Sequence, residues 1–560
     1  MRAVYLLVTI SLLSFFTSTQ AATITPRLEA ALQELSDTDQ VDVIVRMRNR
    51  VNLKNFDKVN RKLKRTAYRT QLLRDLENRN LSEHNALKAR FSWLKNKKSK
   101  SLWIINGFAQ SLSAAQIIEL AQNPRVESID LDAIITLATP VPSALAPTEG
   151  NLDMVKAPVL WSYGYSGQGI VVANMDTGVD YNHADLATTW RGGSNSWYDP
   201  YGQNSLPADK NGHGTHTMGV IVGGAATGTA IGVAPGAQWI AAKIFDNAGS
   251  ATASAIHASF QWMLNPDGNL ATDDAPDVVN NSWGDLASVG RCNPNPPYND
   301  TEYLTDIQTL KQAGIMVIFS SGNSGPADNS GLIPATYGAS YAVGAVDSNG
   351  DVTSFSSRGP SACADAIAPN DVFPNVVAPG LNIKLADITL SGLFPTAYTT
   401  GSGTSFAAPH VTGAVALLKS AYPSATVSEL EAAINNSAVD VDNPGIDTHT
   451  GYGLLDIRQA LFQLPVDTDS DTVNDGSDNC ILEANSSQID ADGDGYGNRC
   501  DPDIDNNGIV NLVDFIYFRN AYLSADPVAD FNSDGIVNLV DYVIFRNYYL
   551  KPPGPSGLVP

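Results

Sequence analysis

Short apolar runs alternate with helical segments along the middle of the chain, from about Leu152 to Leu464. The runs include GIVVANM, QWIAAKIF, PDVVNNSWG and GIMVIFSSGN, which are apolar along most of their length. Such strands are typical of a parallel sheet covered by helices on both faces. The pattern therefore predicts an α/β fold for residues 141–464. In such sheets, functional side chains gather at the carboxyl ends of the strands.

A smaller unit precedes this region, between Val41 and about Ile135. A strand, VDVIVRM, is followed by a long charged helical stretch, and the unit ends in an alternating strand. This order predicts a small α+β domain within residues 23–140. The next segment, Leu137–Asn151, is rich in Pro, Ala and Ser, which is typical of an exposed linker that proteases cut.

The N-terminus has the pattern of a secretory signal peptide, residues 1–22. Arg2 precedes an apolar run from about Val4 to Phe16, and small residues follow as far as Ala21 or Ala22. This run is too short to span a bilayer, and no second run of spanning length follows, so we expect a secreted protein without a transmembrane segment.

Export permits disulfides, and the chain has four cysteines. Cys480 and Cys500 lie close in sequence, which predicts a bond between them. A bond between Cys292 and Cys363 is a second prediction, which sequence alone does not decide.

Charge divides the chain into a basic front and an acidic body. Residues 1–140 hold 21 Lys and Arg against 13 Asp and Glu, a balance of +8, while the whole chain has a net charge of -23. The remainder is therefore at -31. The two parts should attract each other, although a solvated basic helix would give the same pattern. The acidic body would repel phosphate, and the basic part has no recognisable nucleic-acid motif, so we expect no nucleic-acid partner.

Three segments carry residues suited to nucleophilic catalysis. Asp176 ends a buried strand in GIVVANMDTGVD, and His213 stands where a Gly-rich loop enters a helix in NGHGTHTMGVIVGG. Ser405 lies between a glycine-rich turn and a helix of small residues in GSGTSFAAPHVTGAVALL. The free N–H groups at a helix start can stabilise an oxyanion. Taken singly, the three could be a turn residue, a surface histidine and a helix cap.

Together, in the order Asp, His, Ser, these motifs resemble the catalytic blocks of the subtilisin-like serine proteases, over roughly residues 151–462. The resemblance implies that Asp176 orients and charge-stabilises the imidazole, that His213 takes the proton of the hydroxyl, and that Ser405 attacks the scissile carbonyl. His216 corresponds to a helix-packing histidine. Asn323, in FSSGNSGP, corresponds to the family's side-chain oxyanion donor.

The same resemblance implies a binding cleft for an extended peptide. Ser282, Trp283 and Gly284 in NNSWG would pair with the substrate on one side, and Gly249, Ser250 and Ala251 would form the opposite rim. Trp283 should favour bulky apolar side chains before the cut, unless it is an ordinary core tryptophan.

The primary pocket is expected near Phe319–Gly322 and Leu332–Pro334. No acidic residue is visible there, which favours an apolar or broad primary specificity. The long segment between Asp176 and His213 is similar to that of the bacillopeptidase F-like branch. Phe406 stands where the family commonly has an oxidation-sensitive Met.

The front segment also resembles a known module. NGFAQSLSAAQIIELAQNPRVESIDLD is similar to the last part of the subtilisin propeptide inhibitor, which implies that residues 23–140 act as a folding template and block the cleft until they are cut away.

The C-terminal region is rich in Asp and repeats itself. DIDNNGIVNLVD from Asp503 and DFNSDGIVNLVD from Asp530 recur at an interval of 27 residues, with oxygen side chains at loop positions 1, 3, 5, 9 and 12 and Gly at 6. This spacing suits Ca²⁺, although an acidic turn-rich linker is the alternative. With Asp at position 12, residues 503–552 resemble dockerin type I repeats, and residues 465–502 resemble thrombospondin type 3-like calcium repeats.

These resemblances imply Ca²⁺ as a cofactor and a cohesin-like partner. The partner would read Leu512, Val513, Leu539 and Val540, unless these side chains form the core of the module. The last residues, 553–560, are expected to be a disordered tail. The candidate calcium ligands are Asp467, Asp469, Asp471, Asp475, Asp490, Asp492, Asp494, Asp501, Asp503, Asp505, Asn507, Asn511, Asp514, Asp530, Asn532, Asp534, Asn538 and Asp541.

The sequence thus predicts a secreted serine endopeptidase that acts on proteins or peptides and is made as a self-processed zymogen, with its own propeptide as inhibitor. The alternative is a calcium-stabilised binding or assembly protein that carries a degenerate protease scaffold.

Overall fold

The structure is a computed structural model that describes residues 22–34, 39–95, 98–137, 150–226, 228, 230–288, 301–363 and 372–559. The expected signal peptide, apart from Ala22, and linker residues 138–149 lie outside the described residues. The chain forms two compact units. The first contains the described residues up to Val51 together with Leu76–Asp132, and the second contains Asn52–Asp75 and the described residues from Ala133 on.

The first unit is a five-stranded sheet with helices, as the pattern predicts. Its strand order is β1-β5-β2-β4-β3, with β2 antiparallel to both β4 and β5. Alternating side chains such as Val43, Val45 and Phe108 meet Ile117 and Ile129 in its core. The strands are β1 (Thr23–Ile24), β2 (Gln40–Met47), β3 (Lys100–Leu102), β4 (Gly107–Ser113) and β5 (Val126–Leu131). The helices are α1 (Pro26–Glu34), α4 (Ser92–Lys95), η1 (Trp103–Ile105) and α5 (Ala114–Ala121).

The charged stretch between β2 and β3 forms two helices, α2 (Leu53–Asn60) and α3 (Arg65–Arg90). Asn52 begins α2 by accepting the N–H of Asn55 on its side chain, a common N-cap arrangement. Helix α3 is shared between the two units, because its residues as far as Asp75 belong to the second.

A seven-stranded sheet of order β14-β13-β12-β11-β7-β9-β8 forms the middle of the second unit, and its strand pairs are parallel. Strands β11, β12, β13 and β14 are buried at every residue, so both faces of the sheet are covered, as expected for this α/β class. The strands are β7 (Val171–Asp176), β8 (Trp197–Tyr198), β9 (Gln238–Lys243), β11 (Val278–Asn281), β12 (Met316–Ser320), β13 (Tyr341–Val346) and β14 (Val376–Pro379).

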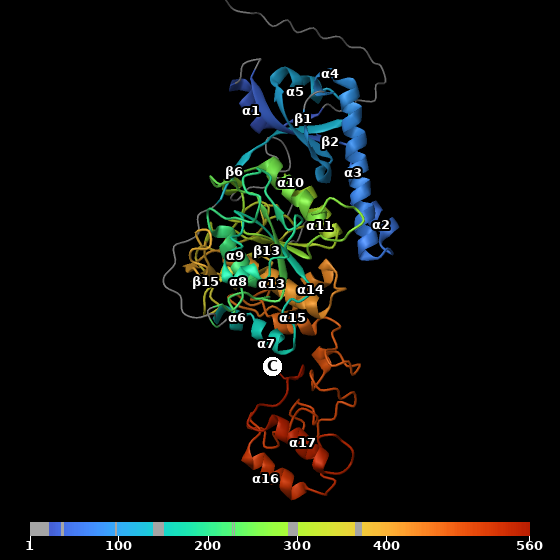
Figure 1. Cartoon of the computed structure of the whole chain (residues 1–560), viewed down its shortest axis with the longest axis vertical. Coiled ribbons are helices and arrows are strands. Elements are labelled where there is room, and N and C mark those ends of the chain that lie inside the picture. Colours follow the sequence, from blue (N-terminus) through green and yellow to red (C-terminus); the bar gives the residue numbers. More distant parts are fainter. Residues whose placement is uncertain are drawn as a thin grey trace, which may run out of the picture. The chain divides into compact units, whose positions relative to one another are not determined.

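Helices and short strand pairs surround this sheet, and Figure 1 labels the α-helices. The helices are α6 (Gly150–Met154), α7 (Ala157–Ser162), α8 (Ala184–Ala187), α9 (His213–Val222), α10 (Ala253–Leu264), η2 (Leu286–Ser288), α11 (Leu304–Gln312), α13 (Thr404–Ala421), α14 (Val427–Ser437) and α15 (Ile457–Phe462). The two antiparallel pairs are β6 (Ile134–Thr136) with β10 (Ser250–Thr252), and β15 (Ile383–Ala386) with β16 (Tyr398–Gly401).

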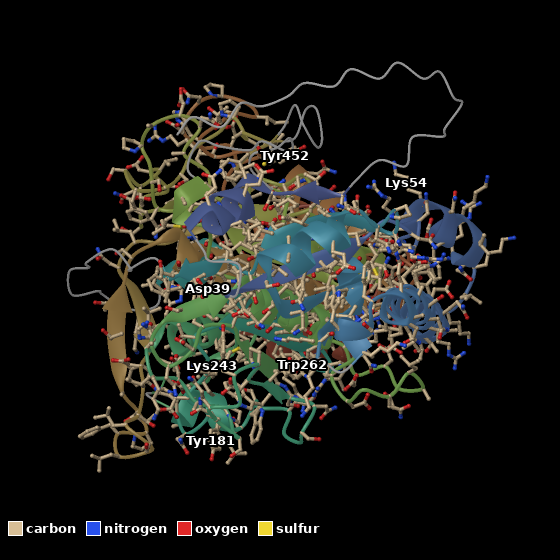
Figure 2. The ribbon with its side chains drawn as sticks, turned by 90° about the horizontal axis from the view of Figure 1, so that it is seen from above. Asp39, Lys54, Tyr181, Lys243, Trp262 and Tyr452 are labelled. Carbon is tan, nitrogen blue, oxygen red and sulfur yellow. A yellow bond between two sulfur atoms is a disulfide. The ribbon has the colours of Figure 1, made fainter. Side chains whose placement is uncertain are left out.

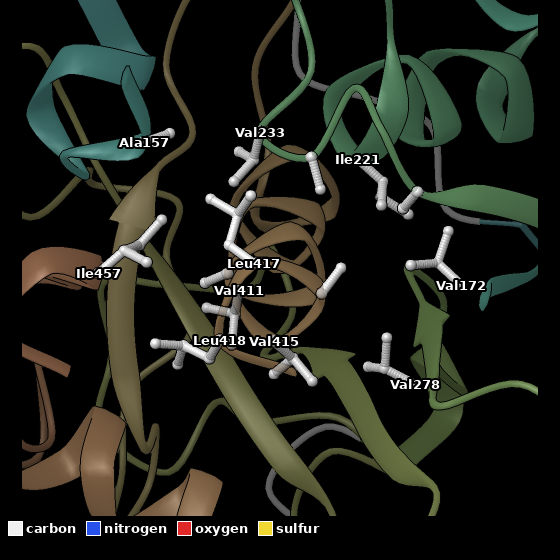
Figure 3. Packing of buried hydrophobic residues seen from close by; sticks show 14 of the residues in the cluster. Ala157, Val172, Ile221, Val233, Val278, Val411, Val415, Leu417, Leu418 and Ile457 are labelled. Atoms are coloured by element: carbon white, nitrogen blue, oxygen red, sulfur yellow. The ribbon is translucent and has the colours of Figure 1, made fainter. Parts of the chain in front are cut away.

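Helix α13 lies at the centre of the packing, against the sheet and α9. Figure 3 shows its side chains Val411 and Val415 among apolar residues from the sheet and neighbouring loops. A side chain on Gly413 would bring its Cβ within 2.5 Å of the Val233 side chain. The small residues of this helix therefore permit a close approach, and this approach fixes the helix end that carries Ser405.

The repeats at the C-terminus form a pseudo-twofold pair around α16 (Leu512–Ala521) and α17 (Leu539–Tyr548). The N–H of Leu550 donates to the carbonyl of Val510 at 2.7 Å, and the N–H of Leu523 donates to that of Val537 at 2.8 Å. Leu550 and Leu523 are 27 residues apart, and so are Val537 and Val510, so the two bonds join equivalent positions of the two repeats. Phe518, Phe531 and Phe545 fill the core between the helices, which lie side by side in Figure 1.

The prediction of a disordered tail at 553–560 is wrong for the residues described there, which end at Val559. Gly554 donates its N–H to the carbonyl of Cys500 at 2.8 Å, and Gly557 donates to that of Asp478 at 2.7 Å. Arg458 donates to the carbonyls of Ser556 and Val559, and Ser556 is buried. Composition indicated disorder, but these distant partners satisfy the backbone of the tail.

The disulfide between Cys480 and Cys500 is present, with an S–S distance of 2.09 Å. Cys363 is also in a disulfide, but its predicted partner, Cys292, lies outside the described residues. Within the described ranges, no helix is long and apolar enough to cross a membrane.

Candidate active site

Asp176 is the last residue of β7, between β9 and β11 of the sheet. It is buried, and its Oδ1 accepts the N–H of Thr177 at 2.7 Å. A carboxylate at the end of an inner strand is held by the sheet and shielded from water. Asp176 is therefore suited to orienting a second group rather than to binding solvent.

His213 begins α9 and makes a close contact with Asp176. Its Nδ1 lies 2.8 Å from Oδ1 and 3.0 Å from Oδ2 of that carboxylate. Burial lowers the pKa of His213, but the charge and hydrogen bond of Asp176 outweigh this effect and raise that pKa above its ordinary value. The ring is thus fixed through Nδ1, which leaves Nε2 to act as a base on another group.

The loop before His213 is held by Asp209 and by glycines. Asp209 accepts the N–H of Gly212 at 2.9 Å and that of Thr215 at 3.0 Å. Gly212 has a φ of 101°, a left-handed value that favours glycine. A Cβ on Gly214 would come within 2.0 Å of the Gly178 carbonyl. The Gly-rich motif therefore lets α9 start directly against the end of β7.

Ser405 lies in the first turn of α13, next to the pair. The ring of the adjacent Phe406 lies 6.0 Å from that of His213, centroid to centroid. In this structure the Ser405 hydroxyl donates to the carbonyl of Ser282 at 3.3 Å. Among the described residues no hydrogen bond joins Ser405 to His213, so the hydroxyl must rotate to reach the imidazole.

Asn323, in the loop after β12, has its amide oriented by the same helix start. Its Oδ1 accepts the N–H of Thr404 at 2.9 Å and the hydroxyl of Thr404 at 2.8 Å. A Cβ on Gly403 would lie 3.2 Å from the Nδ2 of Asn323, which places the NH₂ group beside the turn before Ser405. This NH₂ group and the backbone N–H of Ser405 are two donors of the kind that an oxyanion hole uses.

The predicted substrate contacts divide into surface and core positions. Trp283 is only 3% exposed, and its ring packs against Phe260, Tyr303 and Phe319. The side chain of Ser282 donates to the carbonyl of Ser405 at 2.8 Å. These contacts favour the core alternative for the tryptophan side chain.

The two segments expected to form the primary pocket lie together. Leu332 donates its N–H to the carbonyl of Ser321 at 3.2 Å, and a Cβ on Gly284 would come within 2.9 Å of the Leu332 side chain. The opposite rim is a strand, because Ser250 and Ala251 belong to β10 and pair with Thr136 and Ile135 of β6.

His216, three residues after His213, contacts a different aspartate. Its Nε2 lies 3.1 Å from Asp387, and its ring lies beside that of Phe406.

Lys243 was missed by sequence reasoning. This lysine, labelled in Figure 2, is the last residue of β9 and is buried. Its Nζ donates to the carbonyl of Thr177 at 2.5 Å. Burial lowers the pKa of Lys243, although the charges of Asp209 and Asp199 oppose this effect. A lysine at the end of the apolar strand QWIAAK is the feature of the sequence that could have indicated a buried charge.

A buried polar network, also missed, joins the elements below the site. Asn174 donates to the carbonyl of Gly214 at 3.1 Å and to the hydroxyl of Thr217 at 2.9 Å. Asn280 donates to Asn174 at 3.0 Å and accepts the hydroxyl of Thr412 at 3.2 Å. The network links β7, β11, α9 and α13, and so fixes the elements that carry Asp176, His213 and Ser405.

Nine of the predicted calcium ligands form three acidic clusters within the described residues. Their carboxylate oxygens lie within 4.8 Å of one another in each cluster. Burial and the nearby carboxylates of Asp478 and Asp471 raise the pKa of Asp469 to about 6. The clusters are Asp467, Asp469 and Asp471; Asp490, Asp492 and Asp494; and Asp503, Asp505 and Asp514.

The two repeat loops share one backbone arrangement. Asp503 accepts the N–H of Gly508 at 2.6 Å, and Asp530 accepts that of Gly535 at 2.7 Å. Asp514, at position 12 of its loop, accepts the N–H of Asp505 at 3.1 Å. Asp541 likewise accepts the N–H of Asn532 at 3.1 Å. In both loops, backbone N–H groups thus donate to the carboxylates at loop positions 1 and 12.

Other predicted ligands have protein partners. Asn511 and Asn538 cap α16 and α17 with their side-chain oxygens. Asp475 accepts the N–H and the hydroxyl of Thr468. Asn507 donates to Asp505, and Asn532 donates to Asp534. Burial, with Asp494 and Asp492 nearby, raises the pKa of Asp501 to about 8.

Comparison with known proteins agrees with this geometry. The model of the subtilase family matches residues 167–453, about half of the chain. The chain belongs to the subtilase family, which confirms the predicted resemblance for the α/β region. This membership supports a serine endopeptidase.

Two subtilisins are covered over most of their length. Subtilisin DY of Bacillus licheniformis is 32% identical over 313 residues, which are 55% of this chain and 97% of that protein. Subtilisin E of Bacillus subtilis (strain 168) is 31% identical over 370 residues, which are 65% of this chain and 83% of that protein. Bacillopeptidase F of Bacillus subtilis (strain 168) is 34% identical over 399 residues, 64% of this chain. The match spans only 26% of bacillopeptidase F.

Proposed function

We propose that this chain is a serine endopeptidase in which Asp176, His213 and Ser405 form the catalytic triad. The observation that carries the proposal is the buried contact of His213 with both oxygens of Asp176, at 2.8 and 3.0 Å, beside the start of α13. The same contact supports an active enzyme over the degenerate scaffold, because Asp176 holds His213 in the orientation that a general base requires.

The reaction follows from these positions. The Ser405 hydroxyl turns from the Ser282 carbonyl to Nε2 of His213, which takes its proton as the oxygen attacks the scissile carbonyl carbon. The oxyanion is held by the Ser405 N–H and the Asn323 NH₂ group. His213 then gives its proton to the leaving amine, and an acyl-enzyme remains. Water attacks the ester while His213 takes a proton from it, and the proton then passes to the Ser405 oxygen as the acid product leaves.

An extended substrate fits between two rims. The main chain at Ser282–Gly284 forms one side and Gly249–Ala251 forms the other. Support comes from the antiparallel pairing of β10 with β6, because a substrate strand would add to the rim in the same way. With Leu332 and Phe319 near the expected primary pocket, the enzyme should accept apolar or varied side chains.

We also propose that residues 23–140 are an inhibitory prosegment and that residues 1–22 direct secretion. Strand β6 lies just before the linker and occupies the β10 rim. The Ser405→Ala protein should therefore accumulate with the linker uncut, while wild type is cut between Leu137 and Asn151. N-terminal sequencing distinguishes the two, and a Ser405→Ala protein that is cut normally after purification would contradict self-processing.

Calcium is a further proposal, for the acidic clusters after residue 465. Asp503, Asp505, Asn507 and Asp514 would hold one ion in the first loop, with the corresponding residues in the second. The group fits the first loop because one oxygen from each of Asp503, Asp505 and Asp514 lies within 4.8 Å of the others and a divalent cation would neutralise them. The second loop repeats the same spacing and the same backbone contacts. After chelation, the chain should unfold at lower urea concentration, and Asp503→Asn with Asp530→Asn should remove about two bound ions.

A docking role is a second candidate function for residues 503–552. It is supported by the exposure of Leu512 and Leu539, at 59% and 64%, and of Val513 and Val540 beside them. We propose a cohesin-like protein domain as the partner. Leu512→Asp with Leu539→Asp in the full chain should abolish binding of a cohesin domain, whereas Leu206→Asp, at another exposed leucine, should leave it intact. If the native chain does not bind the cohesin domain, the docking role is refuted and calcium stabilisation is the one role left for these residues.

A further inference from the structure

A basic helical segment, Asn52–Asp75, belongs to the same compact unit as the large sheet, and we call it the docking arm. It contains α2 and the first part of α3. The arm carries eight Lys and Arg residues against two Asp, in a chain whose net charge is -23. The arm lies between β2 and β3 in the sequence of the expected prosegment, far from β6. Its contacts within the second unit are therefore separate from those of β6.

Two arginines of the arm bind two aspartates. Arg65 lies 2.7 Å from Asp277, and Arg69 lies 2.7 Å from Asp273. Their spacing of four residues places both on one face of α3. Arg69 also donates to the carbonyl of Ala313 at 2.6 Å, and its side chain is only 5% exposed.

Burial raises the pKa of Asp273, but the charge and the hydrogen bond of Arg69 outweigh it and lower that pKa below its ordinary value. Asp273 thus remains charged beside a buried guanidinium. Breaking the Arg69–Asp273 ion pair leaves two charges that must be rehydrated or remain unpaired. It therefore costs more free energy than breaking an ion pair on the exposed surface.

These contacts lie at the amino edge of the sheet. Asp277 directly precedes β11, and its second oxygen accepts the N–H of Val171, the first residue of β7, at 3.2 Å. Asp176 stands at the other end of β7. Because a strand advances about 3.3 Å per residue, the arm is attached roughly 17 Å from the catalytic aspartate.

We propose that the docking arm is a second, electrostatic anchor that keeps the prosegment bound to the peptidase after the linker is cut. This inference rests on the proposed zymogen function. The β6–β10 pair holds the prosegment at the catalytic rim, and Arg65 with Arg69 holds it at the opposite edge. Release requires both contacts to open, so the arm slows activation, and salt weakens it through the more exposed Arg65 pair.

The first test compares full-length wild type with Arg65→Ala/Arg69→Ala and with Arg74→Ala, a control at an exposed position of the same helix. Each protein is allowed to process, is then blocked with a serine-directed phosphonate, and is followed by gel filtration. All three should be cut at the linker, and the double variant should lose the cut prosegment on the order of tenfold faster. Equal rates of loss would overturn the proposal.

A second measurement needs no catalysis and therefore separates failure of the anchor from failure of the peptidase. In the Ser405→Ala precursor, Asp273→Asn should raise hydrogen exchange in α2 and at the start of α3 and leave β6 protected. Unchanged exchange in the arm would overturn the anchor even if the enzyme is active. Loss of protection throughout the second unit would also contradict it, since the aspartate would then support the fold rather than the arm.

Discussion

His257 should make the folded chain lose stability as the solution becomes alkaline. This histidine is fully buried on α10, and each ring nitrogen faces a carboxylate. Nδ1 lies 2.9 Å from Asp306 on α11, and Nε2 lies 2.8 Å from Glu302. Both nitrogens donate only when the ring is protonated. Burial lowers the pKa of His257, but the two carboxylates outweigh it and raise that pKa to about 9.

The magnitude follows from the two protonation equilibria. An unfolded histidine has a pKa of about 6.5, and the difference from the folded value corresponds to about 3 kcal/mol. The folded state binds the proton more tightly, so the stabilisation is fully present below about pH 6.5 and is lost as the pH rises through about 9. Loss of the proton would leave the buried carboxylate of Asp306 and the partly buried carboxylate of Glu302 facing a neutral ring.

Urea unfolding of the Ser405→Ala protein provides the assay, because this background avoids self-digestion. Tryptophan fluorescence follows the unfolding, and Trp283, whose ring lies 5.7 Å from that of Tyr303, is one of the eight tryptophans that contribute. Between about pH 6 and pH 10, the background should lose about 3 kcal/mol more than His257→Asn loses. His449→Asn, at a more exposed histidine, is the control and should behave as the background. An equal loss in His257→Asn would refute the reasoning.

Three further outcomes are expected. Activity should increase as the pH rises through the raised pKa of His213, because only the neutral ring accepts a proton; a maximum near pH 4 would contradict that role. Wild type should survive mild peroxide, and Phe406→Met should make activity sensitive; equal inactivation would show that another group controls the loss. Gly557→Ala should free the C-terminal tail to proteases, because its Cβ would come within 1.9 Å of the Asp475 carbonyl. An unchanged digestion pattern would contradict that contact.

The sequence predicted the sheet, and it selected Asp176 and His213 as candidates that the structure brings into contact, because both depend on local pattern. Asp176 and His213 follow an apolar strand and a Gly-rich loop, and elements of this kind meet at one edge of a parallel sheet. The network of Asn174, Asn280 and Thr412 was not predictable, because its members are polar residues within apolar runs and their pairing depends on the register between β7 and β11.

Long-range contacts also account for the other differences. The tail at 553–559 has the composition of a disordered segment, yet its order depends on the carbonyls of Cys500 and Asp478, which no local pattern reveals. Arg65 and Arg69 stand in a helix with arginines along its length, so only the fold distinguishes the two that meet aspartates from those that face water.

Labelling of the active serine tests the central claim most directly. The full-length protein is treated with a serine-directed phosphonate and digested, and the modified residue is located by mass spectrometry. We expect one modification, at Ser405, and none in Ser405→Ala, because the reagent requires a hydroxyl activated by His213 and an oxyanion hole. An unlabelled wild type, or label at another serine in both proteins, would contradict the account.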